Sequence, residues 1–176
     1  MHGEYGEDGT VQELLRDIKL AHTGSDVMAS SLAMNKILAY RTFKSHGLKV
    51  PASNVVDLRD LHSLDHSQYD LPAVVKPADR GSSMGVSIVR RIDDIRDALD
   101  KAFSYSTRAL IEEYVPGKEL TCGVIDDGMG NVFPLPVTEI IPGAHFFDFN
   151  SKYTAGASQE ITPARVSDDI TGTVQA

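Results

Sequence analysis

The sequence predicts an α+β fold in which amphipathic helices and short apolar strands share one chain. Two observations support this prediction. Apolar side chains recur at helical spacing in segments 11–18 and 95–103. Short β-branched or alternating runs at 71–75, 86–89 and 109–115 have the two-residue period of strands. With 176 residues, the chain can bury the core of one domain or of two small ones.

The first part of the chain predicts three helices. Thr10 and Glu13 form a capping-box pattern, with the threonine as N-cap of the first helix. Asp26 would cap a short second helix that ends near Leu32, and a third would run over about 34–46. Beyond this helix, extended chain around residues 55–56 and a polar region of short helix and loop at 58–69 are expected.

The second part predicts strands around one further helix. Asp93 or Asp94 would cap the helix that ends near Phe103. After the strand at 109–115, Gly117 bends the chain. The remaining expected elements are a strand at 120–125, an irregular extended segment at 132–141 and a short helix after 167.

The composition excludes several classes of protein. A formal net charge of -8 without a basic run argues against nonspecific nucleic-acid binding. No apolar run approaches the ~18 residues of a membrane span, and no export signal opens the chain, so a cytoplasmic protein is expected. The single cysteine, Cys122, cannot form an internal disulfide, and its apolar surroundings predict core packing over a reactive thiol.

The segment 76–85, KPADRGSSMG, carries the clearest chemical signal. Lys76 supplies a positive charge directly after the strand at 71–75, while Gly81 and Gly85 allow the backbone to approach a ligand and Ser82 and Ser83 add hydroxyl groups. The order of residues matches neither the GxxxxGK[ST] nor the GxGxxG nucleotide motif. From this stretch alone, a phosphate-binding loop and a glycine-rich hairpin with a surface lysine both remain open.

Flanking motifs give the segment a family context. The run VVKPADRGSSMGVS at 74–87 resembles the phosphate-binding loop of the ATP-grasp superfamily, and within it the D-alanine:D-alanine ligase family. That family also carries HGxxGEDGT, LIEEYVxGxE and KY motifs, which match segments 2–10, 110–119 and 152–153 in the same order. The resemblance covers nearly the whole chain.

The resemblance implies an incomplete ATP-grasp fold, preceded by the tail end of an α/β, Rossmann-like N-terminal domain. Residues 1–25 would be the remnant of that domain, 26–113 the small ATP-grasp subdomain, and 114–176 the truncated beginning of the large one. The family's RxD and ExN motifs, whose side chains bind magnesium and stabilise an oxyanion, have no counterpart here. We therefore expect an internal fragment with little or no ligase activity by itself.

The resemblance also implies an activity. Ligases of this family transfer the γ-phosphate of ATP to the carboxylate of one D-alanine, and the amine of a second D-alanine then forms the dipeptide used in peptidoglycan synthesis. ATP and D-alanine would be the small-molecule substrates, and Mg²⁺ or Mn²⁺ is expected for the full-length enzyme. The family is usually dimeric. No metal ligand is assigned in this chain, and no nucleic acid or membrane partner is expected.

Carried over position by position, the resemblance assigns most of the nucleotide-binding residues. Lys36 and Lys76 would contact phosphates, and Glu119 the ribose. The closing loop and the adenine segment would be formed by Ser82, Ser83, Met84, Glu112, Glu113, Tyr114 and Val115. From the residues alone, Lys36 is an exposed helix lysine, and Glu112 and Glu113 form a solvated strand end.

Five residues would act at the reacting groups. Lys152 would reach the phosphates from a loop that covers the site, and Tyr153 would share a hydrogen-bond network with Ser82. His2 and Glu7 would lie at the substrate end, with Glu7 partly structural. Without the resemblance, His2 is only a terminal residue. Tyr153 favours an amine nucleophile over a hydroxyl.

Two other functions remain open at this point. One is another ATP-grasp ligase that joins a carboxylate to a different amine, although the GEDGT and KY motifs weigh against it. The other is a non-catalytic ATP-binding module. These alternatives differ in the amine they would require and in whether any reaction follows nucleotide binding.

Overall fold

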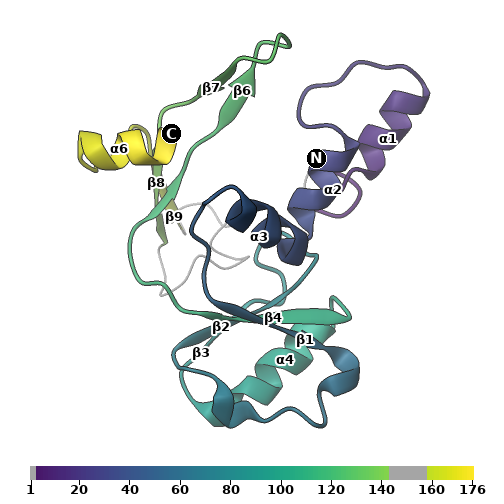
Figure 1. The fold of residues 1–176 in the computed structure, drawn as a ribbon, viewed down its shortest axis with the longest axis vertical. Helices are drawn as coiled ribbons and strands as arrows, with labels where there is room; N and C mark the ends of the chain where they lie inside the picture. Colours follow the sequence, from purple (N-terminus) through teal and green to yellow (C-terminus); the bar gives the residue numbers. More distant parts are fainter. Residues whose placement is uncertain (1–2, 143–157) are drawn as a thin grey trace. The chain divides into compact units, whose positions relative to one another are not determined.

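The computed structural model describes residues 3–142 and 158–176. The chain forms two compact units, Met1–Val115 and Pro116–Ala176, which are described separately below (Figure 1). This boundary lies close to the predicted one at 113, while the assignment of subdomains stays a prediction. No helix in the described part of the chain is both long and apolar enough to cross a membrane.

The first unit is built on a four-stranded antiparallel sheet with the strand order β1-β4-β2-β3. The strands are β1 (Ser53–Asp57), β2 (Ala73–Pro77), β3 (Ser87–Val89) and β4 (Arg108–Glu113). Strands β2 and β3 form the predicted hairpin around the glycine-rich loop, and Lys76 lies within β2, not after it. The region 58–69 holds two 3₁₀ turns, η1 (Leu58–Asp60) and η2 (His66–Gln68).

Helix α4 (Ile95–Phe103) covers one face of this sheet (Figure 1). Its apolar residues point inward, as their spacing predicts, and burial of a side chain as large as Ile95 or Leu99 contributes about 1.5–3 kcal/mol. The buried residues of the helix are Ile95, Ala98, Leu99 and Ala102. The predicted aspartate cap is wrong: a 3₁₀ turn, η3 (Ile92–Asp94), runs straight into α4, so Asp94 has helical backbone angles and makes no side-chain cap.

Helix α3 (Lys36–Ser45) lies over the opposite face of the sheet (Figure 1). Ile37 and Tyr40, three residues apart, pack against Leu110 of β4. The prediction started this helix near residue 34, but Asn35 separates it from α2 (Val27–Met34). The Asn35 side chain accepts hydrogen bonds from the amides of residues 37 and 38 at 3.1 and 3.2 Å and so caps α3.

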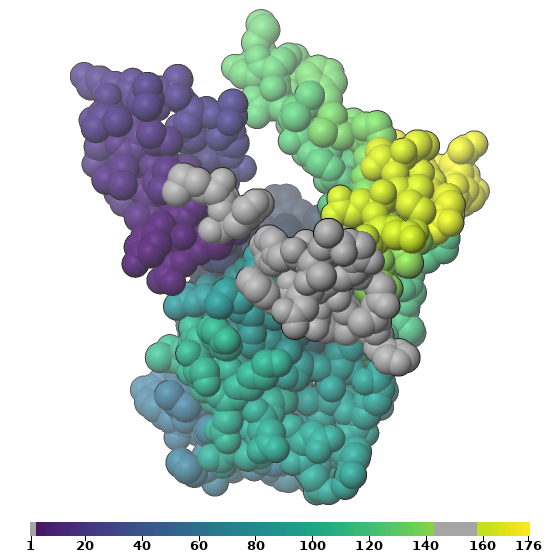
Figure 2. Space-filling view, turned by 180° about the vertical axis from the view of Figure 1, so that it is seen from behind, coloured from purple at the N-terminus to yellow at the C-terminus, as the bar shows by residue number. Residues whose placement is uncertain are grey.

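Helix α1 (Thr10–Asp17) begins one residue away from the predicted position. Thr10 is its first helical residue, and the N-cap is Gly9 with a left-handed φ of 99°. A side chain at Gly9 would lie 2.7 Å from the carbonyl oxygen of Val27, so this turn requires glycine. Helix α1 lies away from the sheet in Figure 1, and its residues are at the surface in the purple part of Figure 2. Its apolar face is uncovered, with Leu14 61% exposed.

The second unit contains a three-stranded antiparallel sheet, a hairpin and a helix. The sheet order is β5-β8-β9, with strands β5 (Glu119–Thr121), β8 (Thr138–Pro142) and β9 (Ser158–Ile161). The hairpin pairs β6 (Val124–Asp126) with β7 (Val132–Pro134), and α6 (Asp168–Gln175) is capped by Ser167.

The strand predicted at 120–125 is therefore wrong as a single element. It breaks at Cys122 and Gly123 into β5 and β6. Cys122 is half-buried, and its Sγ donates to the carbonyl oxygen of Leu135 at 3.2 Å. The expected core packing of this cysteine is not observed, because the break removes it from both sheets.

Candidate functional site

Two charged side chains from neighbouring strands meet on the face of the sheet that carries α3. Val74 pairs with Glu112 and Lys76 with Leu110 in the β2–β4 register, so Lys76 and Glu112 share one face. Lys76 Nζ lies 2.5 Å from Glu112 Oε2, and the side chains are 20% and 2% exposed. Glu112 is therefore not the solvated strand end that the residues alone predict, because the sheet and α3 enclose its carboxylate.

Tyr40 of α3 completes this cluster. Its hydroxyl donates to Glu112 Oε2 at 3.3 Å and accepts from Lys76 Nζ at 3.4 Å. Burial raises the pKa of the Tyr40 phenol, and the Lys76 charge only partly offsets this. Burial alone would lower the pKa of Lys76, but the adjacent Glu112 carboxylate raises it above its ordinary value, so the lysine is charged at neutral pH.

One oxygen of this cluster has no partner. Within the described part of the chain, Glu112 Oε1 is buried and accepts no hydrogen bond, while Oε2 receives both Lys76 and Tyr40. A buried carboxylate oxygen without a donor costs about 1–3 kcal/mol or more. Such an oxygen is a ready acceptor for an N–H or O–H group of a ligand.

Lys36 is held against the glycine-rich loop. Its amide donates to the carbonyl oxygen of Ala78 at 2.8 Å, and its Nζ donates to the carbonyl oxygen of Arg80. The side chain is half-buried, so the interpretation as an exposed helix lysine is wrong. The break at Asn35 produces this arrangement, because it turns the first residue of α3 toward the loop.

The loop itself has an unusual backbone. Ser82, Ser83 and Gly85 all have left-handed φ angles, of 51°, 57° and 70°. Non-glycine residues rarely adopt this conformation, and such strain is concentrated at functional sites. Turn hydrogen bonds from Met84 N to Gly81 O at 3.1 Å and from Val86 N to Ser83 O at 3.3 Å fix the shape of the loop.

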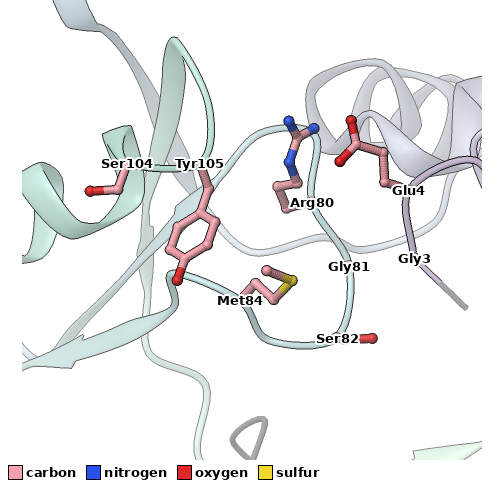
Figure 3. A pocket seen from close by; sticks show the side chains of 8 residues that line it. All are labelled: Gly3, Glu4, Arg80, Gly81, Ser82, Met84, Ser104 and Tyr105. Atoms are coloured by element: carbon pink, nitrogen blue, oxygen red, sulfur yellow. The ribbon is translucent and has the colours of Figure 1, made fainter.

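A cavity of about 230 Å³ lies beside this loop (Figure 3). Figure 3 shows Arg80 and Glu4 at one end of the cavity and Met84 and Tyr105 at the other. The complete lining is Gly3, Glu4, Arg80, Gly81, Ser82, Met84, Ser104 and Tyr105. The N-terminal turn and the loop thus share one recess within the first unit.

Glu7 organises the N-terminal turn. Its Oε2 accepts from the amide of Gly3 at 2.6 Å, and it lies 3.7 Å from the position that a Cβ on Gly81 would occupy. The same carboxylate therefore closes the turn and borders the loop. The role expected for Glu7 at the substrate end stays a prediction.

Metal ligands are not grouped in the part of the chain that the structure describes. Among residues 3–142 and 158–176, no three His, Cys, Asp or Glu side chains are placed to hold a metal ion. The described residues therefore do not fit a magnesium site.

Comparison with known proteins decides the family. Residues 42–176 match the family described as "D-ala D-ala ligase C-terminus". The chain belongs to this family. It is 46% identical to the D-alanine–D-alanine ligase of Syntrophobacter fumaroxidans, over 99% of this chain and 57% of that protein, and 43% identical to that of Geobacter sulfurreducens, over 93% and 50%. The chain thus spans about half the length of these curated relatives.

Solved structures of the family share the fold. The VanG D-Ala:D-Ser ligase from Enterococcus faecalis matches with a TM-score of 0.83 and 28% identity, over 99% of this chain and 51% of that one. The D-alanine–D-alanine ligase from Bacillus anthracis matches with a TM-score of 0.76 and 32% identity, over 99% and 56%. The predicted ATP-grasp fold is confirmed for the portion that this chain covers.

The structure brings some of the predicted family residues together and leaves others apart. Lys36, Lys76, Glu112 and the 82–84 loop all belong to the first unit, on or beside the face that α3 covers. Glu113 is exposed at the end of β4, where its Oε1 accepts from the amide of Ala52 at 3.0 Å. The site assignments for these residues stay predictions.

The structure describes three further predicted site residues, Tyr114, Val115 and Glu119. The amide of Tyr114 donates to the carbonyl oxygen of Pro72 at 3.1 Å, and Val115 is exposed. Glu119 begins β5 in the second unit. The remaining predicted residues lie outside the described part of the chain: His2, Lys152 and Tyr153.

Sequence reasoning missed two charged or polar residues. Tyr40 had no signal beyond its helical position facing the sheet. For Glu139 the sequence did carry a signal, because an acidic residue stands within the apolar strand β8. Its carboxylate accepts from Arg165 at 2.9 Å and from Lys118 at 3.1 Å, and these hydrogen bonds lower its pKa to about 2.

Proposed function

We propose that this chain supplies the nucleotide-binding part of an ATP-dependent D-alanine–D-alanine ligase. The observation that carries the proposal is the buried cluster of Lys76, Glu112 and Tyr40 on the face of the sheet that α3 covers. It provides an ammonium group that the Glu112 carboxylate keeps charged, and a carboxylate oxygen that accepts no hydrogen bond from the described residues. The family relationship agrees with this use of the cluster.

The phosphate end of ATP would be bound by lysines and by the loop. Glu112 and Tyr40 account for two of the three donors of the Lys76 ammonium, which leaves one for a phosphate oxygen. Lys36 adds a second positive charge beside the loop. The left-handed backbone at Ser82, Ser83 and Gly85 would allow the loop to approach the phosphates closely.

The base end would be recognised by Glu112. Its unpartnered Oε1 is an acceptor, and the exocyclic amino group of adenine is a donor. Guanine carries a carbonyl oxygen at the corresponding position, so GTP would leave Oε1 without a donor and add a second acceptor. This asymmetry predicts a preference for ATP, because an unsatisfied buried polar group is costly.

The bound nucleotide would serve acyl transfer. The carboxylate of the first D-alanine attacks the γ-phosphorus, and ADP leaves. The amine of the second D-alanine then attacks the acyl phosphate carbon, the amine loses a proton, and inorganic phosphate leaves with the dipeptide formed. In this scheme Lys152 contacts phosphate, Tyr153 and Ser82 share a hydrogen-bond network, and His2 and Glu7 border the amino-acid end. Donors aimed at developing negative charge supply most of such catalysis.

Binding of ATP to the 176-residue chain is the direct test. Isothermal titration should detect ATP and show at least about tenfold weaker binding of GTP. Lys36→Met should weaken ATP binding by about tenfold or more through loss of a phosphate contact, whereas Lys44→Met, an exposed lysine of the same helix, should leave it unchanged. Equal affinity for both nucleotides, or no ATP binding, would contradict the proposal.

A second candidate differs only in the amine. The Enterococcus faecalis structure is that of a D-Ala:D-Ser ligase, which shows that the family fold accommodates another amine donor. ADP release by the protein that carries this chain, measured with D-alanine alone and with D-alanine plus D-serine, separates the two. We expect D-alanine alone to support ADP release.

The remaining proposals follow from the family: a cytoplasmic enzyme, a homodimer, and no nucleic-acid or membrane partner.

A further inference from the structure

Tyr40 stands at a point where it can control the position of Lys76. It projects from α3 onto the sheet, with its ring among Ile37, Ala78 and Leu110. Helix α3 also begins with Lys36, so one rigid element presents both a lysine and this tyrosine to the site. The ring is therefore fixed by packing before any ligand binds.

The Tyr40 hydroxyl contacts both members of the ion pair at once. It donates to Glu112 Oε2 at 3.3 Å and accepts from Lys76 Nζ at 3.4 Å, while Nζ and Oε2 are 2.5 Å apart. These three polar atoms form a closed triangle. The Lys76 ammonium also lies 6.0 Å from the centre of the Tyr40 ring.

The triangle explains why Lys76 contacts only one oxygen, Oε2, of the Glu112 carboxylate. An ammonium beside an isolated carboxylate can move between its two oxygens or bridge them, because both carry equal charge. The Tyr40 hydroxyl gives Lys76 a second acceptor on the Oε2 side and so favours that side. As a result Oε1 stays without a partner, and Nζ is directed by two contacts and not one.

We propose that Tyr40 is a positioning residue, which holds the Lys76 ammonium in the orientation that binds the phosphates of the nucleotide. This inference rests on the proposed function. Tyr40 need not touch the nucleotide, since its effect passes through Lys76. Loss of the hydroxyl should therefore weaken ligands that carry phosphate more than ligands that lack it.

Tyr40→Phe tests this because it removes the hydroxyl and keeps the packed ring. ATP, ADP and adenosine are titrated against the 176-residue chain by competition with a fluorescent ATP analogue. We expect ATP and ADP to bind about 3- to 10-fold more weakly, the effect of one hydrogen bond, and adenosine to be weakened clearly less than either. Tyr69→Phe is the matched control, because Tyr69 is a buried tyrosine in the core on the opposite face of the sheet.

The outcomes separate the two proposals. Unchanged ATP affinity in Tyr40→Phe, or equal weakening of ATP and adenosine, would overturn the positioning role, since a purely structural loss affects all three ligands alike. Weakening of the same size in Tyr69→Phe would also overturn it. Failure of the unchanged chain to bind ATP would contradict the proposed function itself and remove the basis of this inference.

Discussion

Individual residues of the first unit carry more than one task. Glu112 neutralises Lys76 with one oxygen, and its other oxygen has no donor among the described residues, although the side chain is only 2% exposed. Gly85 combines a left-handed backbone with tight packing against Pro77 and Tyr105. In both cases the local environment dictates the residue type, so single substitutions have consequences that can be stated in advance.

Lys76→Met should destabilise the protein by about 3–5 kcal/mol, because it leaves a buried carboxylate without its counter-charge. The double variant Lys76→Met, Glu112→Leu removes both charges and should recover most of that loss. Urea unfolding measures the stability, and ATP titration shows whether binding returns. We expect the double variant to be stable but not to bind ATP. A single variant as stable as the unchanged chain would show that the pair is not desolvated.

Gly85→Ala should destabilise the first unit by about 1–3 kcal/mol. The added Cβ would lie 2.7 Å from Tyr105 Cδ2 and 2.8 Å from Pro77 Cγ, at a φ of 70°. Gly47→Ala is the matched control, since its φ is 77° and no atom lies within 4 Å of the new Cβ. Thermal unfolding should show a clearly larger shift for Gly85→Ala. Equal shifts would mean that only backbone strain matters.

At the scale of elements, the structure joins segments that are distant in sequence through single side chains. Strand β8 and the chain that follows β9 are connected by Glu139, which accepts from Arg165, and by a contact of 2.6 Å between the hydroxyls of Thr138 and Thr162. Lys118, before β5, donates to the same carboxylate. One buried acid of β8 thus contacts the segment before β5 and the segment after β9.

The ion pairs of Glu139 with Lys118 and Arg165 make the stability of the second unit depend on pH. The pKa of Glu139 is lowered to about 2 from an ordinary value of 4.5, so its contribution is present above pH 4.5 and is lost as the pH falls toward 2. Urea unfolding between pH 5 and 2 should show this loss, and Glu139→Gln should show a flatter dependence. Parallel pH curves for the two proteins would exclude Glu139 as the cause.

Across the whole molecule, local patterns predicted elements well and long-range pairing poorly. The apolar face of α4 and the hairpin around the glycine-rich loop follow from spacing within a few residues. The helix start at Thr10 was misplaced because the left-handed turn at Gly9 depends on contact with Val27. The tyrosine of the Lys76 cluster could not be predicted, since Tyr40 is separated from its partners by 36 and 72 residues.

The two units should also differ in local stability, because apolar burial is concentrated in the first. Of the buried apolar residues in the described chain, only Val137 lies in the second unit. Opening free energies follow buried apolar contacts, so hydrogen exchange should be slowest in β2 and β4 and faster in β5 and β8. Exchange of the amides, followed by mass spectrometry or NMR, measures this directly. Equal protection in both sheets would show that the second unit gains its stability from contacts other than its own core.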